Sequence, residues 1–340
     1  MKRFILGTFL VLGVLATGIY VAFQVSPVPS VLAIRYIFAQ GDETAMSALQ
    51  AHVPPGITGQ HNLAYGESPY EVFDVFYPEG TQTPLPTIVW VHGGAWVAGS
   101  KEGVANYLRI LASHGYTAVG IDYTVAPKAV YPTQTQQVMD ALAYLVDNAP
   151  ALNIDPNTIV LAGDSAGAQL AAQAAAIITD PSYGEMVGVE PSIASHRLAA
   201  ILLFCGAYDL GGVDLDGQFG WFLRTVLWAY TGTRDFMNDP EVRTASVANF
   251  VTPDFPATFI TGGNADPLTP QSVRMAERLT AQGVPVEALF FPIDHEPPLQ
   301  HEYQFNLDID AGQDALDRIL DFLGRRVSPA PSAIISSGDG

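Results

Sequence analysis

The pentapeptide Gly163-Asp164-Ser165-Ala166-Gly167 constrains the fold more than any other feature of the sequence. A short apolar run directly before it predicts a strand, and an alanine-rich run directly after it predicts a helix. Glycines on both sides of the serine permit a sharp turn from strand to helix that larger residues would strain. Such a turn holds its central side chain above the carboxyl edge of a parallel sheet. The pattern therefore predicts an α/β fold with an exposed serine at that edge.

Strands and helices are predicted to alternate through most of the chain. The expected strands cover residues 87–91, 117–121, 158–161, 199–204, 257–261 and 286–291; helices are expected near 104–113, 133–148, 270–282 and 311–323, and after Ser165. Residues 70–77 alternate apolar and polar side chains, as a half-buried outer strand does. This order indicates a mostly parallel central sheet with right-handed crossovers and helices on both faces.

The N-terminus carries an uncharged, mostly apolar run at residues 4–23, which is long enough to cross a bilayer as a helix. Lys2 and Arg3 precede it, so the positive-inside rule predicts that everything after the run lies outside the cytoplasm. An uncleaved membrane anchor is favoured over a cleaved signal peptide, because the run is long and no clear Ala-x-Ala site follows it. Cleavage would instead give a secreted protein.

The predicted organisation has four parts. They are a transmembrane or signal-anchor segment at 1–29, a helical collar or lid at 30–65, an α/β catalytic domain at 66–327, and a disordered tail at 328–340. Within the catalytic domain, residues 209–256 break the alternation and are rich in aromatic side chains. These aromatics are expected to form either the wall of an apolar pocket or ordinary core.

Composition excludes some functions. The formal net charge is −19, and no basic stripe is present that could neutralise phosphates, so nucleic-acid binding is excluded. The single cysteine, Cys205, ends an apolar run and is interpreted as a buried strand thiol rather than a catalytic group or a metal ligand. With one cysteine the chain forms no intramolecular disulfide.

A glycine-containing loop, His92-Gly93-Gly94-Ala95-Trp96, follows the predicted strand that ends at residue 91. If Ser165 attacks an ester, an oxyanion develops, and fixed N–H donors at that point commonly supply the largest catalytic term. The expected donors are the N–H groups of Gly93 and Gly94, with Ala166 as the third. His92 is expected to brace the loop rather than to transfer protons. The alternative is that this segment is only a tight turn.

A nucleophilic serine also needs a base and an orienting carboxylate, which follow it in the chain order Ser, Asp, His in this type of fold. Asp266 fits the carboxylate, because it lies in the loop after the predicted strand at 257–261. Its alternative role is turn bonding or helix capping. The loop after residue 291 contains two candidate bases, His295 and His301.

These motifs together resemble the hormone-sensitive-lipase branch of the α/β hydrolases, which are bacterial carboxylesterases and their relatives. The resemblance covers roughly residues 66–325, and the segment Asp122-Tyr123-Thr124-Val125-Ala126-Pro127 is similar to the Asp-Tyr-Arg-Leu-Ala-Pro signature of that branch. Three departures are visible. Ala95 and Ala168 stand where the commonest pattern has glycine, and the histidine segment differs from the usual His-Gly-Phe.

His301 is the preferred base. Its distance of about ten residues from the final predicted helix resembles the position of the histidine in that branch, and Phe305 could anchor its loop. His295 is a competitor, because it follows the strand by four residues, as the family histidine commonly does.

The predicted function is therefore a serine carboxylesterase that cleaves small apolar esters by two-step acyl transfer through Ser165. No metal or organic cofactor is expected. Two alternatives stay open: an amidase or arylformamidase on the same fold, and a non-enzymatic binding module.

Overall fold

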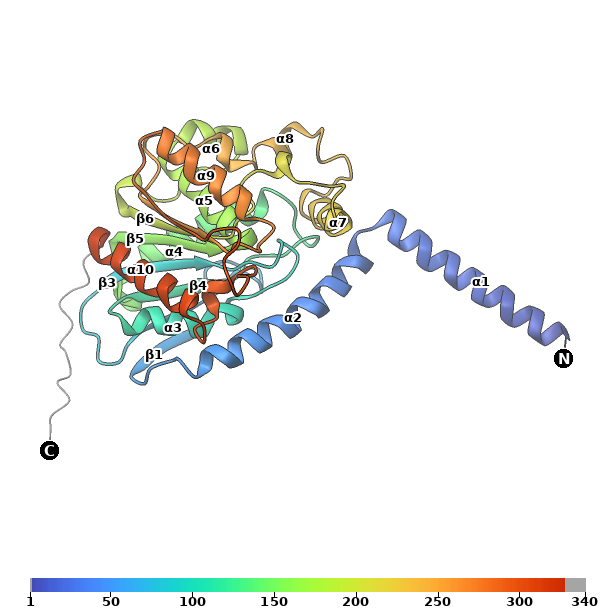
Figure 1. Cartoon of the computed structure of the whole chain (residues 1–340), viewed down its shortest axis with the longest axis horizontal. Helices are drawn as coiled ribbons and strands as arrows, with labels where there is room; N and C mark the ends of the chain where they lie inside the picture. Colours follow the sequence, from blue (N-terminus) through green and yellow to red (C-terminus); the bar gives the residue numbers. More distant parts are fainter. Residues whose placement is uncertain (1, 328–340) are drawn as a thin grey trace.

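The computed structural model describes residues 2–327, and its centre is an eight-stranded sheet in the order β1-β2-β4-β3-β5-β6-β7-β8 (Figure 1). The strands are β1 Ile57–Ala64, β2 Val72–Pro78, β3 Leu85–Val91, β4 Thr117–Ile121, β5 Ile154–Asp164, β6 Leu198–Phe204, β7 Thr258–Gly262 and β8 Val286–Phe290. Strand β2 is antiparallel to both neighbours, and the other pairs are parallel. The predicted α/β fold with a mostly parallel sheet is confirmed.

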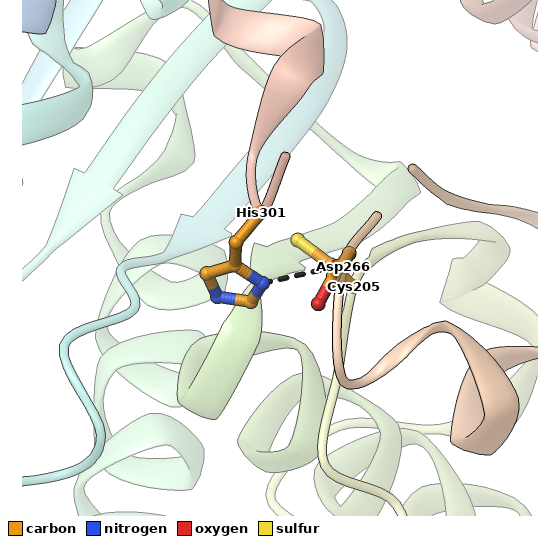
Figure 2. A group of neighbouring side chains, drawn as sticks. All are labelled: Cys205, Asp266 and His301. Carbon is orange, nitrogen blue, oxygen red and sulfur yellow. Dashed lines mark ion pairs between the residues drawn. The ribbon is translucent and has the colours of Figure 1, made fainter. Parts of the chain in front are cut away.

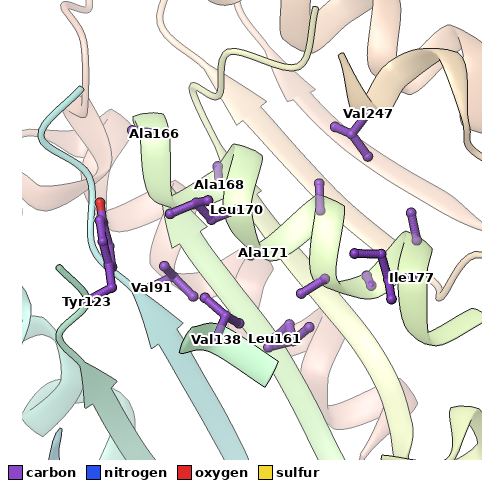
Figure 3. Close-up of a cluster of buried hydrophobic side chains, with 14 of the residues drawn as sticks. Val91, Tyr123, Val138, Leu161, Ala166, Ala168, Leu170, Ala171, Ile177 and Val247 are labelled. Carbon is purple, nitrogen blue, oxygen red and sulfur yellow. The ribbon is translucent and has the colours of Figure 1, made fainter. Parts of the chain in front are cut away.

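Helices cover both faces of the sheet. The longer ones in the body are α3 Ala105–Ser113, α4 Thr133–Asp147, α5 Ser165–Thr179, α9 Thr269–Ala281 and α10 Asp310–Arg326. Side chains of α4, α5 and α9 pack in one hydrophobic cluster, part of which Figure 3 shows, and those of α3 and α10 pack in another. Strand β3 contributes side chains to both clusters, with Val89 in the first and Trp90 in the second. This alternation follows from the two-residue period of a strand.

The outermost strand, β1, differs from the prediction, which placed a helical collar over residues 30–65. That stretch contains most of helix α2, Val28–Gln50, and then the whole of β1. Strand β1 is at the edge of the sheet, and its side chains are exposed or half-buried along its length. An edge strand of this kind needs few apolar residues, so it leaves no clear alternating pattern in the sequence.

The segment between β6 and β7 contains two helices, α7 Gly220–Thr231 and α8 Pro240–Arg243. Some of its aromatic residues form ordinary core, one of the two expected roles, and others are exposed. Tyr230 is buried and stacks on Trp96 with ring centroids 4.6 Å apart. Trp221, by contrast, is 62% exposed.

Helix α1, Lys2–Val25, projects away from the body, whereas α2 lies along it (Figure 1). Among the described residues, no single helix is long and apolar enough to cross a membrane, although Leu12–Val25 and Val28–Gln50 satisfy the length and composition together and are bent by 84° at their junction. The predicted N-terminal membrane helix is not confirmed. The predicted disordered tail, 328–340, lies outside the described residues.

Candidate active site

Ser165 lies at the junction of β5 and α5, as the motif predicts. Its φ is 51°, a left-handed value that is rare for a serine and typical of a strained elbow. A Cβ atom at Gly167 would overlap the carbonyl oxygens of Val91 and His92, and one at Gly163 would overlap the backbone of Gly167. Both glycines are therefore required for close packing. Ser165 is only 9% exposed, less than the motif predicts, because the loop after β3 lies against it.

The N–H group of Gly93, a predicted oxyanion donor, is engaged elsewhere. It donates to Oδ2 of Asp164 at 2.9 Å. The N–H groups of Gly94 and Ala95 donate to no protein group among the described residues. Ala166 is in the first turn of α5, where N–H groups have no partner within the helix. The Gly93 N–H, which was predicted as an oxyanion donor, is therefore less available to a substrate oxygen than the N–H groups of Gly94 and Ala95.

The backbone at Ala95 shows why the commonest pattern of the family has glycine at this position. Its φ is 52° and that of Gly94 is 102°, so both residues have the backbone conformation that glycine adopts at least cost. The alanine at position 95 is strained in this conformation but sterically possible.

Asp164 is a functional residue that the sequence did not indicate. Besides holding Gly93, its carboxyl group accepts a hydrogen bond of 2.7 Å from Nε1 of Trp90. Burial, together with the nearby Glu302 carboxylate, raises the pKa of Asp164 to about 8. The side chain before the nucleophile therefore fixes the loop of expected oxyanion donors to the sheet.

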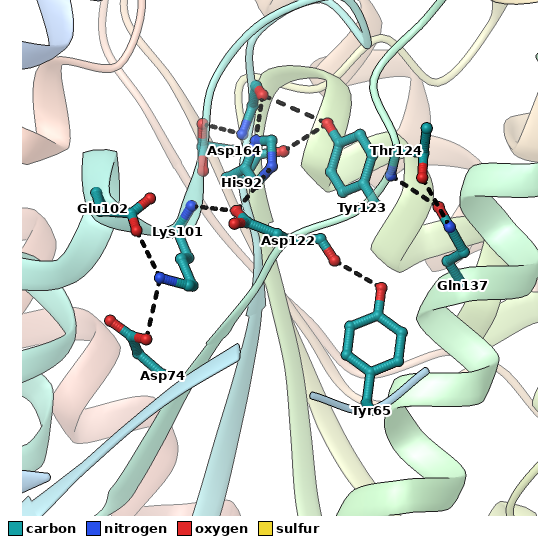
Figure 4. A network of polar contacts seen from close by, with 11 residues as sticks. Tyr65, Asp74, His92, Lys101, Glu102, Asp122, Tyr123, Thr124, Gln137 and Asp164 are labelled. Carbon is teal, nitrogen blue, oxygen red and sulfur yellow. Dashed lines mark hydrogen bonds and ion pairs between the residues drawn. The ribbon is translucent and has the colours of Figure 1, made fainter. Parts of the chain in front are cut away.

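His92 braces the same loop, as predicted (Figure 4). Its Nδ1 lies 2.7 Å from the carbonyl oxygen of Gly93, and its ring stacks on Tyr123 with centroids 4.3 Å apart. The Tyr123 hydroxyl donates to the His92 carbonyl oxygen at 3.0 Å. Burial lowers the pKa of His92, so the imidazole is neutral at neutral pH.

The segment after β4, residues 122–127, also supports the loop. Oδ1 of Asp122 accepts a hydrogen bond of 2.6 Å from the N–H of Lys101, and burial raises the pKa of Asp122 to about 6. The Ala126 N–H donates to the Trp96 carbonyl oxygen at 2.8 Å. The signature that carries the family resemblance thus stabilises the loop rather than contributing reacting groups.

Asp266 and His301 lie together, as predicted (Figure 2). Asp266 is buried in the loop after β7, and its Oδ2 is 3.0 Å from Nδ1 of His301. Its Oδ1 accepts a hydrogen bond of 2.8 Å from the N–H of Leu268. The His295 ring packs on Phe291 instead, with centroids 4.8 Å apart. The structure therefore brings His301, rather than His295, to the carboxylate.

Three contacts fix the loop that carries His301. Asn264, two residues before Asp266, accepts from the Leu299 N–H at 2.8 Å and donates to the His295 carbonyl oxygen at 3.0 Å. At the other end of the loop, Phe305 packs against Tyr107 with ring centroids 5.0 Å apart, as expected for an anchoring aromatic.

The surroundings of His301 include two further ionisable groups. Cys205 is buried, as predicted, but its thiol lies beside the Asp266–His301 pair, which the sequence did not indicate. Glu302 Oε1 is 3.6 Å from Nε2 of His301. Burial lowers the pKa of His301, but contacts with Cys205 and Asp266 outweigh it, and the net effect raises this pKa above its ordinary value.

A hollow of about 440 Å³ lies away from these residues, between the junction of α1 with α2 and helix α7. Phe23, Trp221, Trp228 and Arg234 are among its lining residues, and none of the predicted catalytic residues lines it.

The chain resembles several known esterases in sequence. It is 33% identical to esterase LipC of Mycobacterium tuberculosis over 65% of this chain, a match that spans only 55% of LipC. It is 27% identical to carboxylesterase NlhH of the same species over 86% of this chain and 92% of NlhH.

Solved structures show the same fold. Esterase B of Lactobacillus rhamnosis has a TM-score of 0.72 at 24% identity, over 87% of this chain and 96% of the esterase. The Pyrobaculum calidifontis esterase has a TM-score of 0.69 at 21% identity, over 87% of this chain and 93% of the esterase. The BD-FAE family model matches residues 73–279, which is more than half of the chain. The chain therefore belongs to the BD-FAE family, an α/β-hydrolase carboxylesterase family.

Proposed function

We propose that this chain hydrolyses carboxylic esters through an acyl-enzyme on Ser165, with His301 as general base and Asp266 as the orienting carboxylate. The observation that carries the proposal is the 3.0 Å approach of His301 Nδ1 to Asp266 Oδ2 at the same sheet edge as the elbow serine. The names of the relatives, an esterase and a carboxylesterase, support the same reaction class.

In the first half of the reaction, His301 accepts the proton of Ser165 Oγ while that oxygen attacks the ester carbonyl carbon. The oxyanion is stabilised by the N–H groups of Gly94, Ala95 and Ala166. The tetrahedral intermediate then breaks its bond to the alkoxy oxygen, which takes the proton from His301 and leaves as an alcohol. An acyl group is now covalently bound to Ser165.

In the second half, water attacks the acyl carbon and gives its proton to the same imidazole. Collapse of the second tetrahedral intermediate returns that proton to Ser165 Oγ and releases the carboxylic acid. Asp266 supports both halves, because its carboxylate stabilises the imidazolium that forms each time. The raised pKa of His301 has this contact among its causes.

A matched pair of substrates tests the reaction class. The purified protein should hydrolyse an aryl ester much faster than an N-formyl amide of the same aryl group, because an aryloxy group leaves a tetrahedral intermediate more readily than an amide nitrogen does. Ser165→Ala should lower ester turnover by at least roughly three orders of magnitude, as loss of a triad nucleophile does. Faster amide hydrolysis would contradict the ester assignment, and undiminished turnover in Ser165→Ala would contradict the site.

The body is proposed to lie outside the cytoplasm, held to a membrane by α1. Lys2 and Arg3 at its start fit a cytoplasmic N-terminus. Most apolar side chains of its second half are exposed rather than packed on the body, namely Leu12, Val14, Leu15, Ile19, Tyr20, Val21, Phe23 and Val25. Such a surface is favourable in lipid and costly in water.

A further inference from the structure

Three side chains of different chemistry meet at the carboxyl edge of the sheet. They are Cys205 directly after β6, Asp266 after β7 and His301 after β8, and one potential ligand atom from each lies within 4.8 Å of the other two (Figure 2). Cys205 and Asp266 are buried, and the His301 side chain is about one-third exposed. The group is therefore enclosed on the protein side and accessible from the side of the imidazole.

Two of these atoms contact each other. Asp266 Oδ2 and His301 Nδ1 are buried and form an ion pair at 3.0 Å, and neither has a further hydrogen-bond partner in the described part of the chain. A carboxylate oxygen has two lone pairs, so Oδ2 has the capacity for a second interaction. An Asp–His pair with a thiol next to it has the composition of a metal site.

We propose that Cys205, Asp266 and His301 bind a thiophilic divalent cation such as Zn²⁺ or Cd²⁺, and that its binding inhibits the enzyme. The inhibition rests on the proposed function, because it requires that His301 and Asp266 act in catalysis. The binding itself requires only the three ligands.

The ligand set matches the cation in type and charge. A thiolate, an imidazole nitrogen and a carboxylate oxygen are the ligands that Zn²⁺ takes in proteins, usually with a fourth position filled by water. Binding releases the Cys205 proton and the Nδ1 proton of His301 to solvent. The thiolate and the carboxylate then neutralise the two positive charges of the ion. Mg²⁺ and Ca²⁺ prefer oxygen ligands and should not bind here.

The geometry requires only a small adjustment. With Zn–S of about 2.3 Å and Zn–N of about 2.0 Å, tetrahedral ligand atoms lie about 3.5 Å apart. The span of up to 4.8 Å must therefore close by roughly an ångström. Rotation of the Cys205 or His301 side chain can supply this movement.

Inhibition follows from the atoms used. A cation on His301 Nδ1 replaces the proton that this nitrogen shares with Asp266, so the carboxylate no longer orients the imidazole. The positive ion also makes Nε2 a weaker base, and Nε2 must accept the serine proton. Turnover therefore stops while the cation is bound.

Binding can be measured without catalysis. Co²⁺ is added to the full-length Ser165→Ala protein, which retains all three ligands, and thiolate-to-cobalt charge-transfer absorption is recorded. The band should appear, and Zn²⁺ should displace it. It should be absent when Cys205→Ser is combined with Ser165→Ala. Absence of the band from Ser165→Ala, or its persistence after Cys205→Ser, would overturn the site.

Inhibition is measured separately, as the ratio of ester turnover with and without Zn²⁺ in each variant. Zn²⁺ should inhibit the unmodified protein, a chelator should restore its activity, and Mg²⁺ should have no effect. Cys205→Ser and Cys205→Ala should each raise the inhibitory concentration at least about tenfold, since even outer-shell contacts contribute that much to metal affinity. If Zn²⁺ inhibits both variants at the same concentration as it inhibits the unmodified protein, the proposal is refuted.

The two experiments separate this proposal from the proposed function. If Ser165→Ala retains full esterase activity, the acyl-enzyme assignment fails, although the cobalt band can still appear. If the cobalt band appears but Zn²⁺ leaves turnover unchanged, the inhibitory role is wrong.

Discussion

Asp164 has an unusual position for an acidic side chain, because it is buried directly before Ser165 and accepts hydrogen bonds from Trp90 and from Gly93 in the loop after β3. Its pKa is raised to about 8, whereas an ordinary aspartate has 3.8. The folded state therefore binds a proton that the unfolded chain has already lost over the intervening pH range.

This shift predicts a pH dependence of stability. Where the folded protein binds more protons than the unfolded chain, the free energy of unfolding decreases as pH rises. The Asp164 contribution should therefore be lost progressively between about pH 4 and about pH 8. Asp164→Asn removes the titration, so unfolding by urea at several pH values should show a flatter dependence in this variant.

The exposed Asp147 provides a control, since Asp147→Asn is the same substitution at a position on the surface. Equal slopes in the unmodified protein and in Asp164→Asn would contradict the assigned shift. Asp122 also has a raised pKa, and its contribution, which changes in the same direction, is present in every variant compared.

The choice of base gives a second prediction. His301→Gln removes the imidazole that meets Asp266, so the acylation rate should fall by roughly three to six orders of magnitude, as expected for loss of a triad base. His295→Gln should cost less than about tenfold, because its ring packs on Phe291. Pre-steady-state acylation, with circular dichroism to verify folding, measures both. The reverse ranking would make His295 the base.

At the residue level, chain order was enough to predict where the candidate side chains lie, but it did not predict contacts between side chains that are distant in the sequence. Ser165, Asp266 and His301 follow strand ends that the apolar pattern marks. The hydrogen bond from the Gly93 N–H to Asp164 joins residues 71 positions apart, and no local sequence pattern predicts it. The same is true of the approach of Cys205 to His301.

At the scale of elements, helix α2 connects the N-terminal region to the active site. Val31 and Ile34 are buried against the body. Arg35 donates from Nε to the Val97 carbonyl oxygen at 2.6 Å and from Nη2 to the Ala126 carbonyl oxygen at 2.9 Å. The guanidinium group of Arg35 therefore links the loop after β3 to the segment after β4.

Replacing this arginine should affect stability and activity together. Arg35→Met should lower the free energy of unfolding by about 2 kcal/mol, the size of a hydrogen bond from a charged donor, and should lower kcat because the loop is less firmly held. Arg35→Lys should fall between, since an ammonium lacks the forked geometry that reaches two carbonyl groups.

Arg318→Met is the matched control. Arg318 pairs with Asp314 on the exposed surface of α10, and such pairs contribute about 0.5 kcal/mol or less. If Arg35→Met lowers the free energy of unfolding and kcat no more than Arg318→Met does, α2 does not support the loop after β3.

The elements differ in how well the sequence predicts them, and burial explains the difference. Strands β3 and β4 are buried along their whole length, so their apolar runs stand out. Strand β1 is stabilised mainly by pairing with β2, and polar residues such as Gln60 and Asn62 suit its exposed position. Its pattern therefore resembles a loop.

At the scale of the whole molecule, helix α1 meets the body near its C-terminal end, where Arg234 donates to the carbonyl oxygen of Gln24. Helix α1 extends from the body, and α2 provides the buried contacts (Figure 1). Deletion of residues 1–26 should therefore leave the fold and ester turnover nearly unchanged.

The deletion also tests the proposed anchor. The full-length protein in cell membranes should resist alkaline carbonate extraction, and the deleted form should be released, because the exposed apolar side chains of α1 are the ones placed in lipid. Extraction of the full-length protein, or a mature N-terminus near residue 25, would show that α1 is not a permanent anchor.

The central claim is that Ser165 carries the acyl group, and covalent trapping tests it most directly. The purified protein is treated with a fluorophosphonate ester, and the modified peptide is located by mass spectrometry. The account predicts one adduct, located on Ser165 within its peptide, and no adduct in Ser165→Ala. An adduct on another residue, or equal labelling of Ser165→Ala, would contradict it.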